Sequence, residues 1–397
     1  MSNYVAKIRR PLKVAMVAGE ASGDFLGAGL IKEIKRHHHD AYCYGIGGAL
    51  MQDEGFDSLF PLERLSVMGF VAVLGRLKEL ISIRCRLKRR FIDDQPDVFI
   101  GIDAPDFNLG LELQLKSAGI PIVHYVSPQV WAWREGRLKK IKRSVDHMLA
   151  LLPFEEGYYK DHGVDVTFVG HPLADKVALT SDKNAARLSL GITESGTVIA
   201  ILPGSRKAEI AKLGKIFLTT ARLLSKEIPN VRFIVPCVNE KRKRQLIELL
   251  KDFNDLNLTL YDGSVSEVMA ASDAMLITSG TATLEAALYK RPFVVSYRAG
   301  SITFAIVKKM VKVKYVALPN LLAGKELVPE LLQKDATPEK LCAAMLKSIR
   351  DKAYQAELEQ EFMAMHLQLK RNASELAYGA IKSVMKERRL EHATTLT

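Results

Sequence analysis

Residues 13–30 have the sequence KVAMVAGEASGDFLGAGL. The run Lys13–Ala18 is almost entirely apolar and predicts a short buried strand, whereas Leu26–Lys35 carries apolar residues at helical spacing. The small residues of GEASGD join the two segments. A buried strand that leads through a loop of small residues into a helix is the repeating unit of α/β proteins, so this stretch predicts an α/β fold.

The same alternation continues through the first half of the chain. Leu109–Ser117 predicts a helix, and further strands are predicted at Tyr42–Ile46, Asp97–Ile102, Pro121–Val126, Val145–Leu151 and Val166–Val169. After Val169 comes Gly170-His171-Pro172-Leu173 and then a polar stretch up to Lys183. We place a domain boundary in this stretch, at residues 174/175.

A second alternating series follows the boundary. Helices are predicted at 209–226 and 240–251, and strands at 197–202, 231–236, 258–261, 274–278 and 291–295. We therefore predict two Rossmann-like domains with parallel sheets, residues 1–174 and 175–350, followed by charged helices over 351–397. Such domains bind ligands at the carboxyl ends of their strands, which predicts a site in the cleft between the two domains.

Composition limits the class of protein. The 397 residues are 48% hydrophobic and 26% charged, which excludes a disordered chain, and the net charge of +12 indicates a polyanionic partner. Nucleic acid, an anionic membrane surface and a phosphorylated substrate all fit this charge.

Four cysteines without a CxxC pair predict reduced thiols and no zinc site. The first apolar run is too short for a secretory signal, and no run is long enough to span a membrane, so we expect a cytoplasmic protein.

The stretch Leu202-Pro203-Gly204-Ser205-Arg206 ends a predicted strand and precedes a helix. Glycine allows a tight turn whose backbone N–H groups face the ligand crevice. Arginine adds a positive charge, and the N–H donors of its planar guanidinium group have a fixed geometry. This combination suits a diphosphate. The alternative is an ordinary turn with an arginine that faces solvent.

A second loop supports the diphosphate interpretation. Ser279, Gly280 and Thr281 follow a predicted strand and open a helix, so a phosphate can approach the free N–H groups at the helix N-terminus. Glu285 falls one turn later, where its carboxylate can accept hydrogen bonds from both hydroxyls of a ribose. The alternative for Glu285 is an acidic residue that complements the helix dipole. Together the two loops predict a nucleotide-diphosphate site in the second half.

The first half offers a substrate loop and a candidate base. The loop after the first strand lacks GxGxxG, so we predict no NAD or FAD, but Ser22 and Gly23 are small enough to admit a substrate. Asp103 ends the apolar strand 98–102, where its carboxylate can act as a general base. The alternative is that Asp103 or Asp106 caps the next helix, and Asp106 fits the cap better.

Two segments indicate contact with apolar groups. The loop 127–134 contains both tryptophans of the chain and predicts a substrate wall or a membrane anchor, with core packing as the alternative. The apolar segment 67–74 continues at helical spacing and is followed by five basic residues within 84–90. We predict that it binds acyl chains or an anionic membrane surface, and the alternative is a core helix with a solvated flank. The residues assigned to this surface are Val71, Val73, Leu74, Leu77 and Leu80.

Six motifs in this order resemble those of the lipid-A-disaccharide synthase family. They are GEASGD, GIDAPDFNLGLE, HYVSPQVWAWR, LPGSR, SGTATLE and LPNLLAG, and they extend from Gly19 to Gly324. LPGSR and SGTATLE would suit other transferases that use UDP-sugars, whereas GEASGD and SPQVWAWR narrow the match. The resemblance implies a GT-B glycosyltransferase whose C-terminal helices pack back toward the N-terminal domain, which would bind the acceptor and the membrane, while the second domain would bind the UDP-sugar.

The resemblance also implies a reaction. It is the inverting transfer of 2,3-diacylglucosamine from UDP-2,3-diacylglucosamine to the 6-hydroxyl of 2,3-diacylglucosamine 1-phosphate, at the inner face of the inner membrane. Asp103 would be the base and Ser22 would line the substrate site. Arg206, Thr281, Glu285 and Asn320 lie in motifs that resemble those for UDP. We expect no metal and no cofactor.

Two other classes of function stay open at this point. One is another UDP-N-acetylglucosamine-type transferase or epimerase on the same scaffold. The other is a non-enzymatic binder of nucleic acid or of a membrane surface, suggested by the charge of +12. The basic clusters lack the interleaved aromatic residues of a stacking platform, so we expect no nucleic-acid partner. The sequence leaves a homodimer open.

Overall fold

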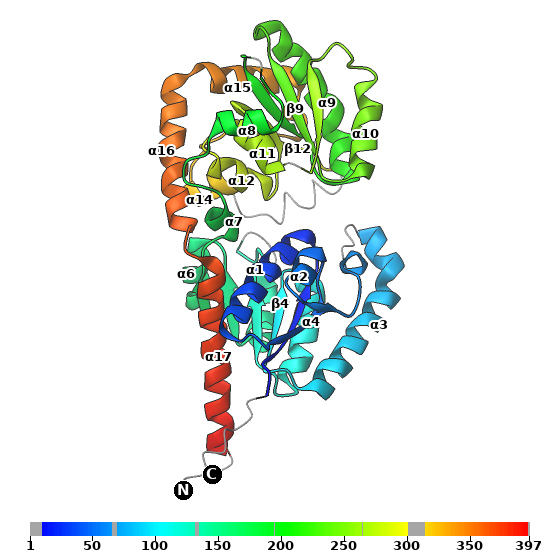
Figure 1. The fold of residues 1–397 in the computed structure, drawn as a ribbon, viewed down its shortest axis with the longest axis vertical. Coiled ribbons are helices and arrows are strands. Elements are labelled where there is room, and N and C mark those ends of the chain that lie inside the picture. Colours follow the sequence, from blue (N-terminus) through cyan, green and yellow to red (C-terminus); the bar gives the residue numbers. More distant parts are fainter. Residues whose placement is uncertain are drawn as a thin grey trace. The chain divides into compact units, whose positions relative to one another are not determined.

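The structure is a computed structural model that describes residues 10–65, 70–131, 135–193, 195–263, 265–300 and 314–395. The chain forms two compact units, Met1–Asp175 together with Leu369–Thr397 and, separately, Lys176–Gln368. Each unit is built on one parallel sheet with helices around it (Figure 1). The prediction of an α/β fold with two such domains is confirmed.

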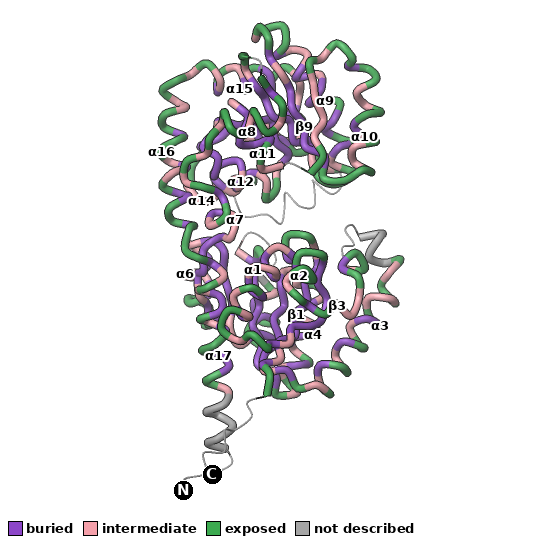
Figure 2. The backbone as a smooth tube through the Cα atoms, in the orientation of Figure 1, coloured by how far each residue is buried: buried purple, intermediate pink, exposed green. Residues whose placement is uncertain are grey.

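The sheet of unit 1 has seven strands among the described residues, in the order β3-β2-β1-β4-β5-β6-β7. Its central strands are buried along almost their whole length, as parallel strands covered on both faces must be (Figure 2). The strands are β1 (Lys13–Ala18), β2 (Tyr42–Ile46), β3 (Asp57–Ser58), β4 (Val98–Ile102), β5 (Ile122–Tyr125), β6 (His147–Ala150) and β7 (Val166–Phe168).

The helices of unit 1 bury one apolar face each. In α1, Leu26, Leu30 and Ile34 recur every four residues and are all buried. The helices are α1 (Ala21–His37), α2 (Ala49–Asp53), α3 (Phe70–Asp94), α4 (Pro105–Lys116), α5 (Leu138–Ser144), α6 (Pro153–Asp161) and α17 (Ala373–Thr395), and α7 (Pro172–Lys176) ends at the unit boundary.

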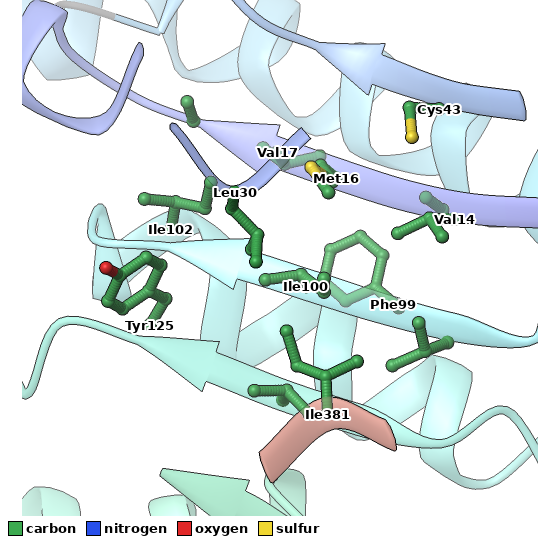
Figure 3. Close-up of a cluster of buried hydrophobic side chains, with 14 of the residues drawn as sticks. Val14, Met16, Val17, Leu30, Cys43, Phe99, Ile100, Ile102, Tyr125 and Ile381 are labelled. Atoms are coloured by element: carbon green, nitrogen blue, oxygen red, sulfur yellow. The ribbon is translucent and has the colours of Figure 1, made fainter. Parts of the chain in front are cut away.

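Helix α17 brings the C-terminal segment of the chain onto the first unit, where it packs against α1 and β6. Tyr378 and Ile381 are buried in the same apolar cluster as the strands β1 and β4. Figure 3 labels Ile381 of α17 and Ile100 of β4 among the side chains of this buried cluster. The ring of Tyr378 also stacks on His37, with 4.5 Å between centroids. The first domain is therefore completed by the last residues of the chain.

Unit 2 has a six-stranded parallel sheet in the order β10-β9-β8-β11-β12-β13, again among the described residues. The strands are β8 (Val198–Leu202), β9 (Arg232–Cys237), β10 (Leu258–Asp262), β11 (Ala274–Thr278), β12 (Phe293–Tyr297) and β13 (Glu330–Leu332). The helices are α8 (Lys183–Ser189), α9 (Lys207–Glu227), α10 (Glu240–Leu250), α11 (Val265–Ala271), α12 (Ala282–Leu288), α14 (Leu318–Ala323), α15 (Pro338–Arg350) and α16 (Lys352–Leu369).

Several local predictions differ from the structure, and three of the differences are informative. Helix α1 begins at Ala21 and not at Leu26, because the small residues of GEASGD form its first turn. The strand predicted at 291–295 is displaced to β12 at Phe293–Tyr297. The short strands β3 and β13 were not predicted, since two or three residues carry too little periodicity to be recognised.

Candidate functional site

The candidate base and the substrate loop of unit 1 come together at a topological switch point. Strands β1 and β4 are neighbours, and the sheet extends in opposite directions from them, which leaves a crevice at their carboxyl ends. A Cβ on Gly19 would collide with Ala104, and a Cβ on Gly23 would touch Ile102, so the two loops are in contact. The exposed Ser22 and the buried Gly23 thus belong to the loop that contacts the end of β4, where Asp103 follows.

Asp103 sits in an unusual backbone corner. Asp103 and Ala104 both have left-handed dihedrals, with φ values of 53° and 44°. Non-glycine residues avoid this region unless surrounding contacts hold them there, and such strain is typical of functional sites. The N–H of Asp103 donates to the Tyr125 carbonyl at 2.8 Å, and its own carbonyl accepts from Asn108 Nδ2 at 2.8 Å. Within the described part of the chain, no hydrogen bond or ion pair engages the Asp103 carboxylate.

The prediction that Asp106 caps the following helix is wrong. Helix α4 begins at Pro105, and Ala104 occupies the N-cap position without a side-chain hydrogen bond. Asp106 lies inside the first turn, where it pairs with Arg137. Proline at the first helical position starts the helix two residues earlier than a cap at Asp106 would. Asp103 is therefore not needed as a cap, and its side chain is available for chemistry.

Asp24, the last residue of GEASGD, has a structural role that the sequence analysis missed. Its side chain is buried, and its carboxylate accepts hydrogen bonds from the backbone N–H groups of Gly48, Leu50 and Met51, at 2.8, 3.1 and 3.0 Å. These groups begin helix α2, so an acid of α1 fixes the start of α2. The glycine at position 27 allows this approach, because a Cβ there would collide with Met51.

The two diphosphate motifs of unit 2 also meet at a switch point. Strands β8 and β11 are neighbours in parallel register, with Leu202 beside Ile277, and the sheet extends in opposite directions from them. LPGSR follows β8 and SGTATLE follows β11. Both predicted loops therefore lie at the carboxyl ends of adjacent strands, where an open α/β sheet binds its ligand.

The LPGSR loop contains an anion in this structure, namely the side chain of Glu209. The Glu209 carboxylate accepts from the N–H groups of Ser205 and Arg206, at 3.0 and 3.1 Å, and from the Arg206 guanidinium at 3.0 Å. A Cβ on Gly204 would collide with Glu209, so only glycine allows this arrangement. The donors predicted for a diphosphate thus already bind a carboxylate, and Arg206 remains half exposed. Glu209 was not singled out from the sequence.

The SGTATLE loop opens helix α12. Ser279 is partly buried, whereas Gly280 and Thr281 are exposed, and Thr281 stands at the N-cap of the helix. A Cβ on Gly280 would meet no atom of the described residues within 4 Å. Glu285 accepts from the Ser266 hydroxyl at 2.9 Å, and burial raises the pKa of its carboxyl. Ser266, on α11, was missed because nothing in its local pattern marks it.

Asn320 has no spare hydrogen-bonding group in the described structure. Its amide Nδ2 donates to the Val328 carbonyl and to Glu330, both at 2.8 Å, while its Oδ1 accepts from the N–H groups of Leu327 and Val328. Its side chain is fully buried. These contacts hold the turn that follows α14, so a role for Asn320 at a substrate would be indirect.

The tryptophan loop is anchored to the core of unit 1. Trp131 Nε1 donates to Glu155 at 3.0 Å, and its ring meets Phe154 edge-on at a centroid distance of 4.8 Å. Glu155 is 3% exposed, and burial raises its pKa to about 7 although Trp131 and the backbone donate to it. Trp133 lies outside the described residues. Trp131 therefore lies in a loop, and its side chain packs against residues of helix α6.

The predicted membrane segment is divided between core and surface. The side chains of Val71, Val73 and Leu74 lie outside the described residues. Further along α3, Leu77 is 44% exposed, Leu80 is partly exposed, and Leu87 is fully buried. The outward-facing apolar stretch therefore ends before Leu87, which belongs to the core cluster.

Several histidines have structural partners. His124 is buried and bonded to Glu112. His37 and His38 contact Glu33 and Tyr378. Within the described part of the chain, no group of three or more potential metal ligands occurs, and no helix is long and apolar enough to cross a membrane. All four cysteines are free, and three of them are buried.

Comparison with known proteins identifies the family. Residues 14–381 match the sequence model of the family described as lipid-A-disaccharide synthetase. The chain belongs to this family. It is 53% identical over 377 residues to the lipid-A-disaccharide synthase of Pseudomonas putida KT2440, covering 95% of this chain and 99% of the relative. It is 54% identical to the enzyme of that name from Pseudomonas syringae pv. tomato DC3000, covering 94% and 98%. The family resemblance and the enzyme class predicted from the motifs are confirmed.

Solved structures agree on the fold. UDP-GlcNAc 2-epimerase from Neisseria meningitidis, bound to UDP-GlcNAc, matches with a TM-score of 0.65 and 14% identity, over 94% of this chain and all of that chain. MurG from Acinetobacter baumannii matches with a TM-score of 0.57 and 13% identity, over 94% and 99%. At such identities the likeness supports the two-sheet GT-B fold alone.

Proposed function

We propose that this protein transfers 2,3-diacylglucosamine from UDP-2,3-diacylglucosamine to the 6-hydroxyl of 2,3-diacylglucosamine 1-phosphate. The products are UDP and a β-1,6-linked disaccharide 1-phosphate. One observation carries the proposal. In a chain of the lipid-A-disaccharide synthetase family, Ser22, Gly23 and Asp103 gather at the switch point of one sheet, and LPGSR and SGTATLE gather at that of the other.

In this proposal unit 1 supplies the acceptor side of the reaction. Asp103 takes the proton of the acceptor hydroxyl as the oxygen attacks C1 of the donor sugar, in a single inverting displacement. The left-handed corner presents the carboxylate at the end of β4, and the exposed Ser22 lines the sugar site in this proposal. Because no described side chain binds the Asp103 carboxylate, it is ready to accept a proton.

Unit 2 supplies the donor side. Negative charge grows on the diphosphate as the bond to C1 breaks, and Arg206 and the N–H groups around Gly280 and Thr281 stabilise it. The three donors of the LPGSR loop bind the Glu209 carboxylate in the present structure, so a diphosphate must replace it there. In this proposal Glu285, whose carboxylate accepts a hydrogen bond from Ser266, hydrogen-bonds the ribose.

We further propose that the protein works in the cytoplasm, at the inner face of the inner membrane. The acyl chains of both substrates require an apolar surface, and α3 exposes Leu77 and Ile81 at 44% and 42%. The basic residues that follow on the same helix attract anionic headgroups, each with about 1 kcal/mol near the surface. Val71, Val73, Leu74 and Leu80 belong to the same proposed surface. The mass of the protein in solution tests whether a second copy of the chain is a partner.

The reaction is tested by incubating the purified protein with both acylated glucosamine substrates, with and without a chelator. We expect UDP release and a disaccharide phosphate by mass spectrometry in both cases. Release of UDP without a disaccharide product would overturn the proposed acceptor. Incubation with UDP-N-acetylglucosamine alone tests the epimerase alternative, because epimerisation needs no acceptor.

Variants assign the roles. Asp103→Ala removes the base but also places alanine in a left-handed conformation, which costs about 1 kcal/mol more than it does for aspartate. Asp103→Asn is the better variant because asparagine tolerates that conformation and cannot take the proton. We expect it to bind UDP normally and to lose most turnover. Arg206→Ala should weaken both UDP binding and turnover. Near-normal turnover by Asp103→Asn would remove Asp103 from the role of base.

A further inference from the structure

A buried ion pair lies behind the candidate base. His124 on β5 and Glu112 on α4 have fully buried side chains, and His124 Nδ1 is 2.6 Å from Glu112 Oε1. Burying a carboxylate and an imidazole costs several kcal/mol unless they pair well, so their presence in an otherwise apolar sheet needs a reason. Burial opposes the charged imidazole, but the carboxylates of Glu112 and Asp103 outweigh it and raise the pKa of His124.

The fold makes room for this pair at one position. Gly101 of β4 lies directly beside His124 of β5 in the parallel register. A Cβ on Gly101 would collide with Glu112 Oε1, so any other residue there would push the carboxylate away from the imidazole. The backbone of Gly101 does not have a positive φ, so its conformation does not require glycine. Glycine is needed here because Glu112 occupies the space that a side chain would take.

The pair is connected to the corner that carries Asp103. One turn before Glu112 on α4, Asn108 is also fully buried, and its Nδ2 donates to the carbonyls of Asp103 and Val17, at 2.8 and 3.1 Å. On β5, the residue after His124 accepts a hydrogen bond from the N–H of Asp103. The left-handed corner is thus held by backbone and side-chain contacts from the same two elements that carry the ion pair.

The buried atoms of this network are incompletely satisfied. His124 Nε2, Glu112 Oε2 and Asn108 Oδ1 have no hydrogen-bond partner among the described residues. A group that serves packing alone would be bonded at both ends or be replaced by an apolar side chain. The charged groups that act on His124 are Glu112, from α4, and Asp103, at the end of β4. The imidazole therefore has one carboxylate bonded to it and a second carboxylate, the candidate base, within electrostatic reach.

We propose that Glu112 and His124 are positioning residues for the transfer reaction, which hold an imidazolium behind the backbone corner of Asp103 and so fix the orientation of the base. This inference rests on the proposed function of Asp103 as the base. Glu112 keeps His124 protonated, the pair fills the space beside Gly101, and Asn108 fixes the backbone of the corner. None of the three needs to touch substrate.

The test compares Glu112→Gln, His124→Gln and the double variant Glu112→Gln/His124→Gln. The double variant can keep a side-chain hydrogen bond at this place without any charge, and it covers the case that a single variant does not fold. Ser144→Ala is the control, because Ser144 is equally buried and bonds α4 through the Leu109 carbonyl without reaching the corner. Each protein is measured for kcat and KM from pH 5 to pH 9, for UDP binding and for stability in urea.

We expect both single variants and the double variant to lose roughly tenfold in kcat, which is part of the ~10²–10⁴-fold that a general base contributes. UDP binding, which depends on unit 2, should be unchanged. The pH profile of kcat/KM should change in these three variants and not in Ser144→Ala, because only they remove charge from behind the base. A packing role would leave the pH profile unchanged.

Two results would overturn the inference. One is a wild-type kcat and pH profile in folded single variants, and the other is recovery of both in the uncharged double variant, which would make the pair structural. The proposed function fails separately, if the wild-type protein forms no disaccharide from the two acylated substrates. If the wild-type protein forms the disaccharide and the variants behave like Ser144→Ala, the proposed function is retained. Only the positioning role of Glu112 and His124 is then rejected.

Discussion

Glu155 gives unit 1 a pH dependence that a single substitution should remove. Its carboxyl is 3% exposed at the start of α6 and accepts hydrogen bonds from Trp131 Nε1 and the Leu152 N–H, both at 3.0 Å. Burial raises its pKa from 4.5 to about 7. The folded protein therefore holds a proton that the unfolded chain releases between pH 4.5 and pH 7, so this group contributes stability at low pH and loses that contribution as the pH rises through this window.

The size of the effect follows from the two pKa values. One pKa unit corresponds to about 1.4 kcal/mol, so the contribution of Glu155 to the free energy of unfolding should fall by roughly 3 kcal/mol between pH 4.5 and pH 7 and stay constant above it. Glu155→Gln has no proton to release and should lack this fall. The amide of glutamine also points one donor at another N–H group, which costs ~1–3 kcal/mol at every pH. The slope, and not the offset, is therefore the quantity to compare.

The assay is urea unfolding at half-unit steps from pH 4.5 to pH 8, followed by far-ultraviolet circular dichroism and by tryptophan fluorescence. Glu156→Gln is the matched control, because the neighbouring Glu156 is partly exposed and pairs with Lys160 at 3.0 Å. We expect the free-energy difference between Glu155→Gln and wild type to change by roughly 3 kcal/mol across the range, and that of the control to stay flat. Parallel curves for wild type and Glu155→Gln would refute the reasoning.

Three further variants test other contacts. Asp24→Ala should destabilise unit 1 by ~2–6 kcal/mol in urea, because it leaves the buried N–H groups of Gly48 and Met51 without acceptors at ~1–3 kcal/mol each; a loss below 1 kcal/mol would contradict this. Gly379→Ala should raise the stability of the same unit by ~0.5–1 kcal/mol, because the glycine lies exposed inside α17 with open space for a Cβ. Burial lowers the pKa of His171 from 6.5 to about 4, so its contribution to stability is complete above pH 6.5 and is lost as the pH falls toward 4, by about 1.4 kcal/mol per pH unit. His171→Asn, which keeps an acceptor for the Leu173 N–H, should show a shallower loss in acid titrations, and an unchanged slope would count against the assignment.

The fold was largely predictable because its signals are local and strong. Lys13–Ala18, Tyr42–Ile46 and Ala274–Thr278 are strands with the predicted bounds, since each is an apolar run bounded by turn residues. The start of α1 was not predictable in the same way, because GEASGD is poor in helix formers and joins the helix only through contacts such as that of Asp24 with α2.

The candidate site was predictable in its loops and not in its supporting contacts. Asp103 could be chosen because it directly follows an apolar strand, and Arg206 because it belongs to the loop after one, where side chains face a crevice. Glu112, Glu209 and Ser266 are separated in sequence from the strand ends and carry no local mark. Their importance depends on which helix turns face the loops, and only the folded chain shows that. The assignments of the substrate residues stay predictions until the variants are measured.

The position of α17 has a consequence for how the protein is made. A ribosome completes the strands of unit 1 early, but the helix that covers α1 is synthesised last, after all of Lys176–Gln368. At roughly 5–20 residues per second, the nascent first unit waits on the order of 10–40 s with the binding surface for Tyr378 and Ile381 uncovered. The second unit can fold as soon as it emerges, so the half of the chain that is translated first should be the last to reach its native state, and its apolar surface should attract chaperones during that interval.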